Sequence, residues 1–170
     1  LLGRALERVD MTMRLLLSRV GDSASSPTWV SVLRAAGAHD TYLRTHRGVL
    51  DANRVIEFML LDRQFPRSAF YSLKLAEHSL DELMQGLSDR AGAGAEARRL
   101  LGRARSELEF IRPGVLLDSL ENRLAGLQAT CRDVGEALAL RYFRFAPWVE
   151  WSDAGRSQDL VSGEVEEGGA

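Results

Sequence analysis

The sequence predicts an all-α fold, an antiparallel bundle of about six helices with a long C-terminal helix. Apolar residues recur at three- and four-residue steps over most of the chain, which is the spacing of one face of an α-helix. Pro and Gly interrupt this pattern at positions that suit helix ends and turns. With 170 residues and 45% apolar residues, the chain can bury one sizeable core without metals or disulfides.

Two helices are expected near the N-terminus. The apolar residues within 2–20 follow one helical face, and Gly21 is a suitable stop. Ser26 as N-cap and Pro27 at the first helical position start a second helix, whose apolar face continues to Leu43.

The next two helices are expected on either side of a polar turn. Asp51 is suited to cap a short helix that ends near Leu61. By periodicity alone this apolar run is equally compatible with a buried strand, but its helical neighbours favour a helix. Pro66 breaks the pattern, and a fourth helix with an apolar face follows as far as Leu87.

The last part of the bundle is expected to hold a fifth helix and a long sixth one. The Gly-rich residues 91–95 are predicted to form a loop, residues 96–111 the fifth helix, and Pro113-Gly114 a turn. Apolar residues within 116–138 then alternate steps of four and three, as in a coiled-coil seam packed along a bundle.

The chain is expected to contain one folded domain and a tail. Residues 1–151 are predicted to form the helical bundle, and residues 152–170, rich in Ser, Gly and Glu, a disordered acidic tail. The chain opens at Leu1 inside a helical pattern, so we expect it to be a fragment whose N-terminal part is missing.

Composition excludes several classes of partner. The formal net charge of −2 gives no basic field for a nucleic acid or an anionic membrane surface. No apolar run is long enough to span a bilayer, and the start does not resemble a signal peptide.

Lys74 is the only lysine among 22 basic residues, which is typical of a GC-rich bacterial genome. The single cysteine, Cys131, rules out an internal disulfide and fits a bacterial cytoplasm.

The usual catalytic and metal-binding signatures are not found in the sequence. It has no phosphate-binding Gly-rich loop, no nucleophile elbow and no helical metal motif, and we predict no metal and no cofactor. His39, His46 and His78 are scattered, and His78 is predicted to be a surface residue. Cys131 falls in a helical apolar pattern, which favours a buried structural thiol over a nucleophile.

One polar cluster is predicted on the first helix. It consists of Arg4, Glu7 and Arg8, which lie about one helical turn apart at most. The apolar residues Met11 and Leu15 lie on the same side of the helix as the two arginines. Apolar residues on this second side predict that something covers it, and covered charges must pair or bind a charged ligand. The cluster is therefore either an interhelical salt-bridge network or an anion site, in which Glu7 orients an arginine or acts as a base.

The second cluster is the polar turn between the third and fourth helices. Its candidate residues for anion binding or for structural ion pairs are Asp62, Arg63, Arg67 and Ser68. Ser68 or Asp62 is suited to cap backbone donors, and Arg67 and Ser68 stand where a helix N-terminus favours an anion. The alternative is a well-formed turn between two helices, with Pro66 as the breaker.

Three segments of the sequence form a recognisable set. They are G-R-A-L-E-R from Gly3, W-V-S-V-L-R from Trp29 and F-M-L-L-D-R-Q-F-P-R-S from Phe58. Together they resemble the bacterial alpha-E family, an all-helical domain of unknown function named for its helices and its Glu-Arg motif. The resemblance covers about residues 1–145 and implies that the chain corresponds to the second of two similar halves. The positions that match the family's two motifs are Arg4, Glu7 and Arg8 in the first and Asp62, Pro66, Arg67 and Ser68 in the second.

The resemblance also implies a functional setting. It implies association with a circularly permuted ATP-grasp ligase, in the same chain or as a separate subunit, and with a transglutaminase-like peptidase. Such systems make or modify short peptides by amide ligation.

We favour an accessory helical domain that binds the ligase and its anionic peptide substrate. The alternatives are an independent enzyme that acts on the ligated peptide with Glu7 as base, and a purely structural or oligomerising bundle. The family offers no established catalytic role for these residues, so enzymatic activity remains open.

Overall fold

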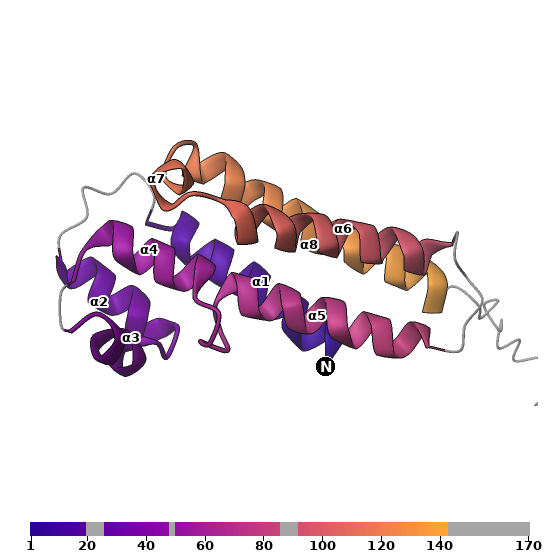
Figure 1. The fold of residues 1–170 in the computed structure, drawn as a ribbon, viewed down its shortest axis with the longest axis horizontal. Helices are drawn as coiled ribbons and strands as arrows, with labels where there is room; N and C mark the ends of the chain where they lie inside the picture. The colour runs from indigo at the N-terminus through magenta and orange to yellow at the C-terminus, as the bar shows by residue number, and fades with distance from the viewer. Residues whose placement is uncertain (20–25, 48–49, 86–91, 143–170) are drawn as a thin grey trace, which may run out of the picture.

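The computed structural model describes residues 1–19, 26–47, 50–85 and 92–142 (Figure 1). Within these ranges the chain is helical, with eight helices and no strand, which confirms the predicted all-α bundle. In chain order the helices are α1 (Leu2–Leu17), α2 (Ser26–Ala35), α3 (His39–Thr45), α4 (Ala52–Leu61), α5 (Ala69–Met84), α6 (Ala93–Phe110), α7 (Pro113–Leu116) and α8 (Leu120–Tyr142).

Four long helices form the body of the bundle. α1 packs against α5 and α8, and α6 packs against the same two helices, so that each of the four has two neighbours. Neighbouring helices run antiparallel, while α2, α3 and α4 gather at one end and α7 joins α6 to α8 (Figure 1). This arrangement buries the apolar stripe of every long helix in one core.

The sequence of each long helix explains which face it buries. The buried residues of α1 recur at helical spacing, and they are Leu2, Ala5, Leu6, Val9, Thr12, Met13 and Leu16. In α8 the seam predicted by the four-and-three spacing is buried at Leu124, Leu127, Cys131 and Val134. The predicted buried thiol is thereby confirmed, since Cys131 is a free cysteine within this seam.

The predicted second helix is wrong in one respect, because it is divided into α2 and α3. Gly37 adopts a φ of +60°, a left-handed conformation that favours glycine. The amide of Gly37 donates to the carbonyl of Arg34, and the amide of Ala38 donates to that of Leu33. This pair of hydrogen bonds is the Schellman motif that ends a helix.

The start of α6 also differs from the prediction. The helix begins at Ala93, so residues 93–95 are helical rather than part of a loop. Gly94 is buried, and a Cβ added there would meet the Met84 side chain at 3.4 Å. Small residues thus let the first turn of α6 pack closely against the end of α5.

The turn predicted at Pro113-Gly114 is a short helix, α7, with Pro at its first turn. The long C-terminal helix begins at Leu120, so Leu116 enters the core from α7.

Asp51 occupies the N-cap of α4 as predicted, but its side chain makes no capping hydrogen bond. The predictions for Gly21, Leu87 and the tail 152–170 lie outside the described residues. No helix in the described ranges combines the length and the apolar character that crossing a membrane requires.

Candidate functional site

The polar turn before α5 is held by two side-chain caps. The Asp62 carboxylate accepts hydrogen bonds from the backbone amides of Gln64 at 2.8 Å and Phe65 at 2.7 Å. Ser68 is the N-cap of α5 and accepts from the amide of Tyr71 at 3.1 Å. Both predicted capping residues therefore cap backbone donors.

Ser68 is fully buried, and its hydroxyl also donates to the backbone carbonyl of Asp62. The hydroxyl thus donates one hydrogen bond and accepts another within the turn and the first turn of α5. Within the described structure, Ser68 and Asp62 shape the turn, and Arg67 is the residue of this segment that reaches the α2 end of the bundle.

Arg67 lies on the surface, and its side chain is hydrogen-bonded to the end of α2. Its Nη1 donates to the carbonyl of Ala36 at 2.8 Å, at the end of α2. A Cβ at Gly37 would stand 2.0 Å from Nη1, so the guanidinium fits there because residue 37 is glycine. The backbone carbonyl of Arg67 accepts a hydrogen bond from the Thr12 hydroxyl on α1 at 3.3 Å. The turn is therefore attached to both α1 and α2.

A groove lies between this turn and α1, the helix that carries Glu7 and Arg8. We call it the α1–α2 groove. Its cavity volume is about 380 Å³, and it is lined by Arg8, Met11, Thr12, Leu15, Ala35, Ala36 and Arg67. The structure thus brings Arg8 from the first predicted cluster and Arg67 from the second to one site.

The described residues cover the second side of α1 only in part. Leu15 is half-buried, but Met11 is 65% exposed. Arg4 is exposed and is not among the residues that line the groove. Within the described ranges Arg4 and Arg8 make no ion pair, so the interhelical salt-bridge network, one of the two alternatives predicted for this cluster, is not observed among these residues.

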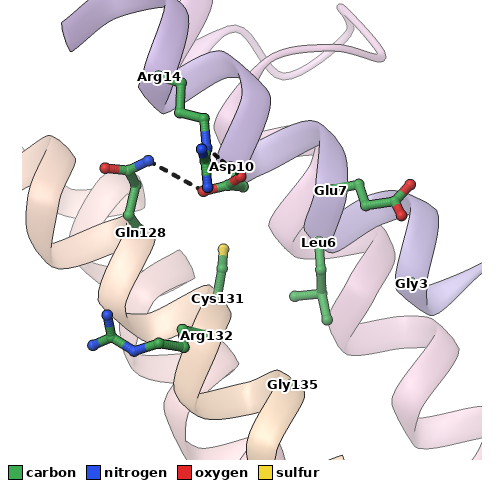
Figure 2. Close-up of a pocket in the computed structure, with 9 residues that line it drawn as sticks. All are labelled: Gly3, Leu6, Glu7, Asp10, Arg14, Gln128, Cys131, Arg132 and Gly135. Atoms are coloured by element: carbon green, nitrogen blue, oxygen red, sulfur yellow. Dashed lines mark hydrogen bonds and ion pairs between the residues drawn. The ribbon is translucent and has the colours of Figure 1, made fainter.

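Glu7 faces a different side of α1 from Arg8, because successive residues of an α-helix are rotated by about 100°. It lines a second groove, the α1–α8 groove, whose volume is about 590 Å³ and whose floor includes Leu6 and Cys131. Figure 2 shows the Glu7 carboxylate extending away from α8. Glu7 is exposed and makes no hydrogen bond or ion pair to another described residue. Glu7 therefore does not lie in the kind of water-excluded pocket in which enzymes place a general base.

Unlike Glu7, three other polar residues of the α1–α8 groove, Asp10, Arg14 and Gln128, are already hydrogen-bonded to one another. The Asp10 carboxylate accepts from Arg14 Nε at 2.7 Å and from the Gln128 amide at 3.1 Å (Figure 2). Burial, reinforced by the charge of Asp10, raises the pKa of the Cys131 thiol to about 12. The thiol is therefore neutral near pH 7 and is a poor nucleophile.

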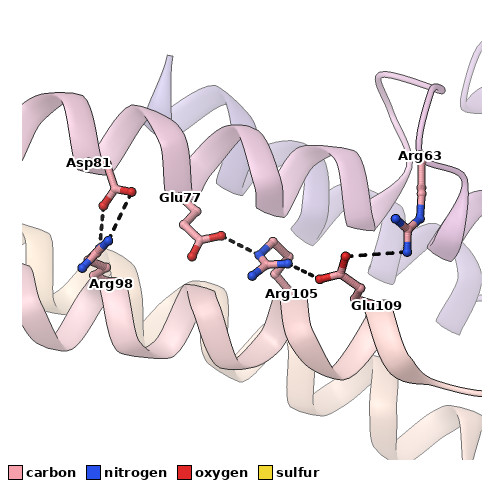
Figure 3. A network of polar contacts seen from close by, with 6 residues as sticks. All are labelled: Arg63, Glu77, Asp81, Arg98, Arg105 and Glu109. Carbon is pink, nitrogen blue, oxygen red and sulfur yellow. Dashed lines mark hydrogen bonds and ion pairs between the residues drawn. The ribbon is translucent and has the colours of Figure 1, made fainter.

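Arg63 belongs to an ion-pair ladder that links the turn to α6. Arg63 pairs with Glu109 at 3.6 Å, and its guanidinium lies 5.1 Å from the centre of the Phe70 ring. Arg105 bridges Glu109 and Glu77 (Figure 3). The hydrogen bond to Glu77 raises the pKa of Arg105.

A separate pair, Arg98 and Asp81, extends the ladder along α5 and α6 with a distance of 2.6 Å (Figure 3). In the described structure, ion pairs of this ladder connect α5 with α6. Among the described residues, no such pair is formed by the predicted cluster on α1. Arg63 has a structural ion pair, one of the two roles predicted for it.

The histidines do not assemble a site in the described ranges. His78 is exposed, as predicted, and lies 3.4 Å from Glu82 on the same helix. His46 stacks on Tyr42 with ring centroids 4.4 Å apart, and His39 contacts Asp40. Among the described residues, no group of three or more His, Cys, Asp or Glu side chains is placed to hold a metal ion.

Sequence reasoning placed Met11 and Leu15 beside Arg8 but missed the rest of the α1–α2 groove. The missed lining residues are Thr12, Ala35 and Ala36. Thr12 is the polar position within the buried stripe of α1, and this exception to the apolar pattern was an available signal. Gly37 was a second signal, since a glycine inside a helical pattern often marks a C-terminal cap. Ala35 and Ala36 carried no signal, because alanine suits any helix position.

These features define an all-helical domain in which the Glu-Arg helix and the polar turn share one groove. A family model described as "Alpha-E: a predicted alpha-helical domain with a conserved ER motif" matches residues 1–143. The chain belongs to this family, as its resemblance predicted, and Glu7-Arg8 is the one Glu-Arg dipeptide in its sequence. No curated protein and no solved structure matches the chain.

Proposed function

We propose that this domain is an accessory module of a bacterial amidoligase system, and that it binds a circularly permuted ATP-grasp ligase and the anionic peptide on which that ligase acts. The ligase belongs either to the same polypeptide or to a separate subunit. A transglutaminase-like peptidase is the second partner in this proposal, and the bacterial cytoplasm is its setting.

The observation that carries the proposal is the α1–α2 groove. It combines two exposed arginines, Arg8 and Arg67, with the apolar side chains of Met11 and Leu15. Arginine binds carboxylates and phosphates through a planar fork of donors, and exposed apolar side chains beside it add contact area. This combination suits the binding of an anionic partner.

The arrangement of the titratable groups favours binding over independent catalysis. Glu7, the candidate base, is exposed and does not line the groove that holds Arg8 and Arg67. The Cys131 thiol is buried and neutral. An enzyme that used Glu7 as base with these arginines as anion clamps would need the three side chains at one site.

The proposal is tested by affinity capture with the full-length protein. Wild type is compared with Arg67→Ala and with Glu7→Ala, and each sample is scored for a bound ATP-grasp ligase and for ATP-dependent amide formation. Arg44→Ala is the matched control, because Arg44 is an exposed arginine on α3, outside both grooves.

We expect Arg67→Ala to lower ligase capture or ligation, and Arg44→Ala to change neither. If the ligase is part of the same polypeptide, ligation alone is the readout. Recovery of no ligase and no ligation with wild-type protein would refute the proposal.

A further inference from the structure

We infer that the α1–α2 groove binds a short peptide segment that presents a carboxylate next to an aliphatic side chain. This inference rests on the proposed function and names the class of substrate that the groove recognises. The carboxylate would lie between Arg8 and Arg67, and the aliphatic side chain would contact Met11 and Leu15.

The first argument is charge. Arg8 has no ion pair within the described structure, and no carboxylate is among the residues that line the groove. Among the described residues, the guanidinium of Arg67 makes one hydrogen bond, from Nη1 to Ala36, and no described residue occupies its other N–H groups. Two arginines without a carboxylate partner at one groove favour an anionic ligand.

The second argument is that Arg67 is held in place before any ligand binds. Ala36 accepts from its side chain, Gly37 leaves room for the guanidinium, and Thr12 holds its backbone. A side chain that is already ordered loses less conformational entropy when it binds a ligand. These contacts are expected of a receptor residue rather than of a solvated surface arginine.

The third argument is the apolar part of the groove. Met11 is 65% exposed, and Ala35 and Leu15 line the groove beside it. The volume of about 380 Å³ falls near the lower end of the range for small-ligand sites, about 300–1,000 Å³. The ligand that fits is therefore small and has an apolar portion as well as a charge.

The other described cavities are less suited to a carboxylate. The α1–α8 groove contains the acidic side chains of Glu7 and Asp10, and Arg14 is already paired there. A cavity between α6 and α8 includes Glu107 and Asp133. Like charges at both sites would repel the ligand, whereas none of the described residues that line the α1–α2 groove is acidic. A fourth cavity, of about 210 Å³, is lined by basic side chains and has no acidic residue in its described lining. It is smaller than the α1–α2 groove, and there Arg63 already pairs with Glu109 and His78 lies 3.4 Å from Glu82.

The test is a calorimetric titration of the full-length protein with the peptide acetyl-Leu-Leu-Glu, which carries a free C-terminal carboxylate. Two comparison peptides are acetyl-Leu-Leu-Gln amide, which has no carboxylate, and acetyl-Gly-Gly-Glu, which has no aliphatic side chain. The protein variants are Arg8→Ala, Arg67→Ala, Arg67→Lys and Met11→Ser, with Arg44→Ala as control. Circular dichroism checks that each variant is folded.

We expect acetyl-Leu-Leu-Glu to bind wild type and the Arg44→Ala control equally well. Arg67→Ala should weaken binding about tenfold or more, as expected for loss of a charge-assisted hydrogen bond. Arg67→Lys should restore part of this loss, since lysine keeps the charge but not the fork. Both comparison peptides should bind more weakly than acetyl-Leu-Leu-Glu.

Two results would overturn the inference. One is that wild type does not bind acetyl-Leu-Leu-Glu at millimolar concentration, and the other is that it binds the amide peptide equally well. Ligase capture then separates this failure from failure of the proposed function. Capture without peptide binding would refute only the substrate class, whereas Arg67-dependent peptide binding without any ligase or ligation would refute only the proposed function.

Discussion

The hydroxyl of Thr12 on α1 donates a hydrogen bond to the backbone carbonyl of Arg67, 55 positions further along the chain. This contact joins the helix that carries the Glu-Arg motif to the turn that carries the second cluster. Thr12 is buried in the α1 stripe, so the bond forms at the edge of the core with little competition from water. It explains why two clusters that are distant in sequence border the same groove.

We predict that Thr12→Val lowers the free energy of unfolding by about 1 kcal/mol, because it removes the donor and leaves the Arg67 carbonyl without this partner. Urea unfolding of the variant and wild type measures the difference. Thr45→Val is the control, since the hydroxyl of Thr45 bonds to the carbonyl of Thr41 on the exposed side of α3. Equal losses in the two variants would show that the Thr12 contact has no special role.

Gly37→Ala tests how the α2–α3 turn holds Arg67. We expect a loss of about 1–3 kcal/mol in unfolding free energy, because alanine is strained at a φ of +60° and its Cβ would collide with the Arg67 guanidinium. In an Arg67→Ala background the collision disappears and only the backbone strain remains. A double-mutant cycle by urea unfolding should therefore give a smaller cost for Gly37→Ala in that background. Equal costs in both backgrounds would rule out the contact.

The overall fold was predictable because it depends on periodicity. The stripes of α1 and α8 repeat over many turns, so a single exception such as Thr12 or Cys131 does not hide them. The helix count was less predictable, since it depends on one residue at a break. Gly37 divides a continuous apolar pattern through its backbone conformation, and α7 places Leu116 in the core before α8 begins.

The site was only partly predictable, because a groove depends on tertiary packing. Sequence spacing grouped Glu7 with Arg8, but the rotation between successive residues puts them at different grooves. Nothing in the sequence shows that Arg67 reaches the end of α2, because that contact requires α1, α2 and the turn to be in place. Ser68 was predictable as a cap because its role is local.

The ladder between α5 and α6 gives a third prediction. Arg105→Met should lower the unfolding free energy by about 1 kcal/mol, because Glu77 and Glu109 both lose their shared cation. The Arg105 side chain is 25% exposed, so added salt should only partly reduce the difference. Arg99→Met is the control, since Arg99 pairs with Glu96 on the exposed side of α6 and should matter little. The measurement is urea unfolding at low and high ionic strength.

The buried thiol gives a prediction about pH. The pKa of Cys131 rises from an ordinary value of 9.0 to about 12 in the folded chain, so folding favours the neutral thiol. Above pH 9 the unfolded chain releases this proton while the folded chain keeps it, and stability must fall as pH rises towards 12. The slope approaches about 1.4 kcal/mol per pH unit. Unfolding measured between pH 8.5 and 10 should show this fall in wild type. Burial also raises the pKa of Tyr42 above its ordinary 10.0, so Tyr42 adds a fall of the same sign near pH 10, and the contribution of the thiol is the part of the slope that Cys131→Ala removes. Cys131→Ala should lower the slope whatever the variant's absolute stability, and equal slopes in the two proteins would mean that the thiol is not desolvated in the fold.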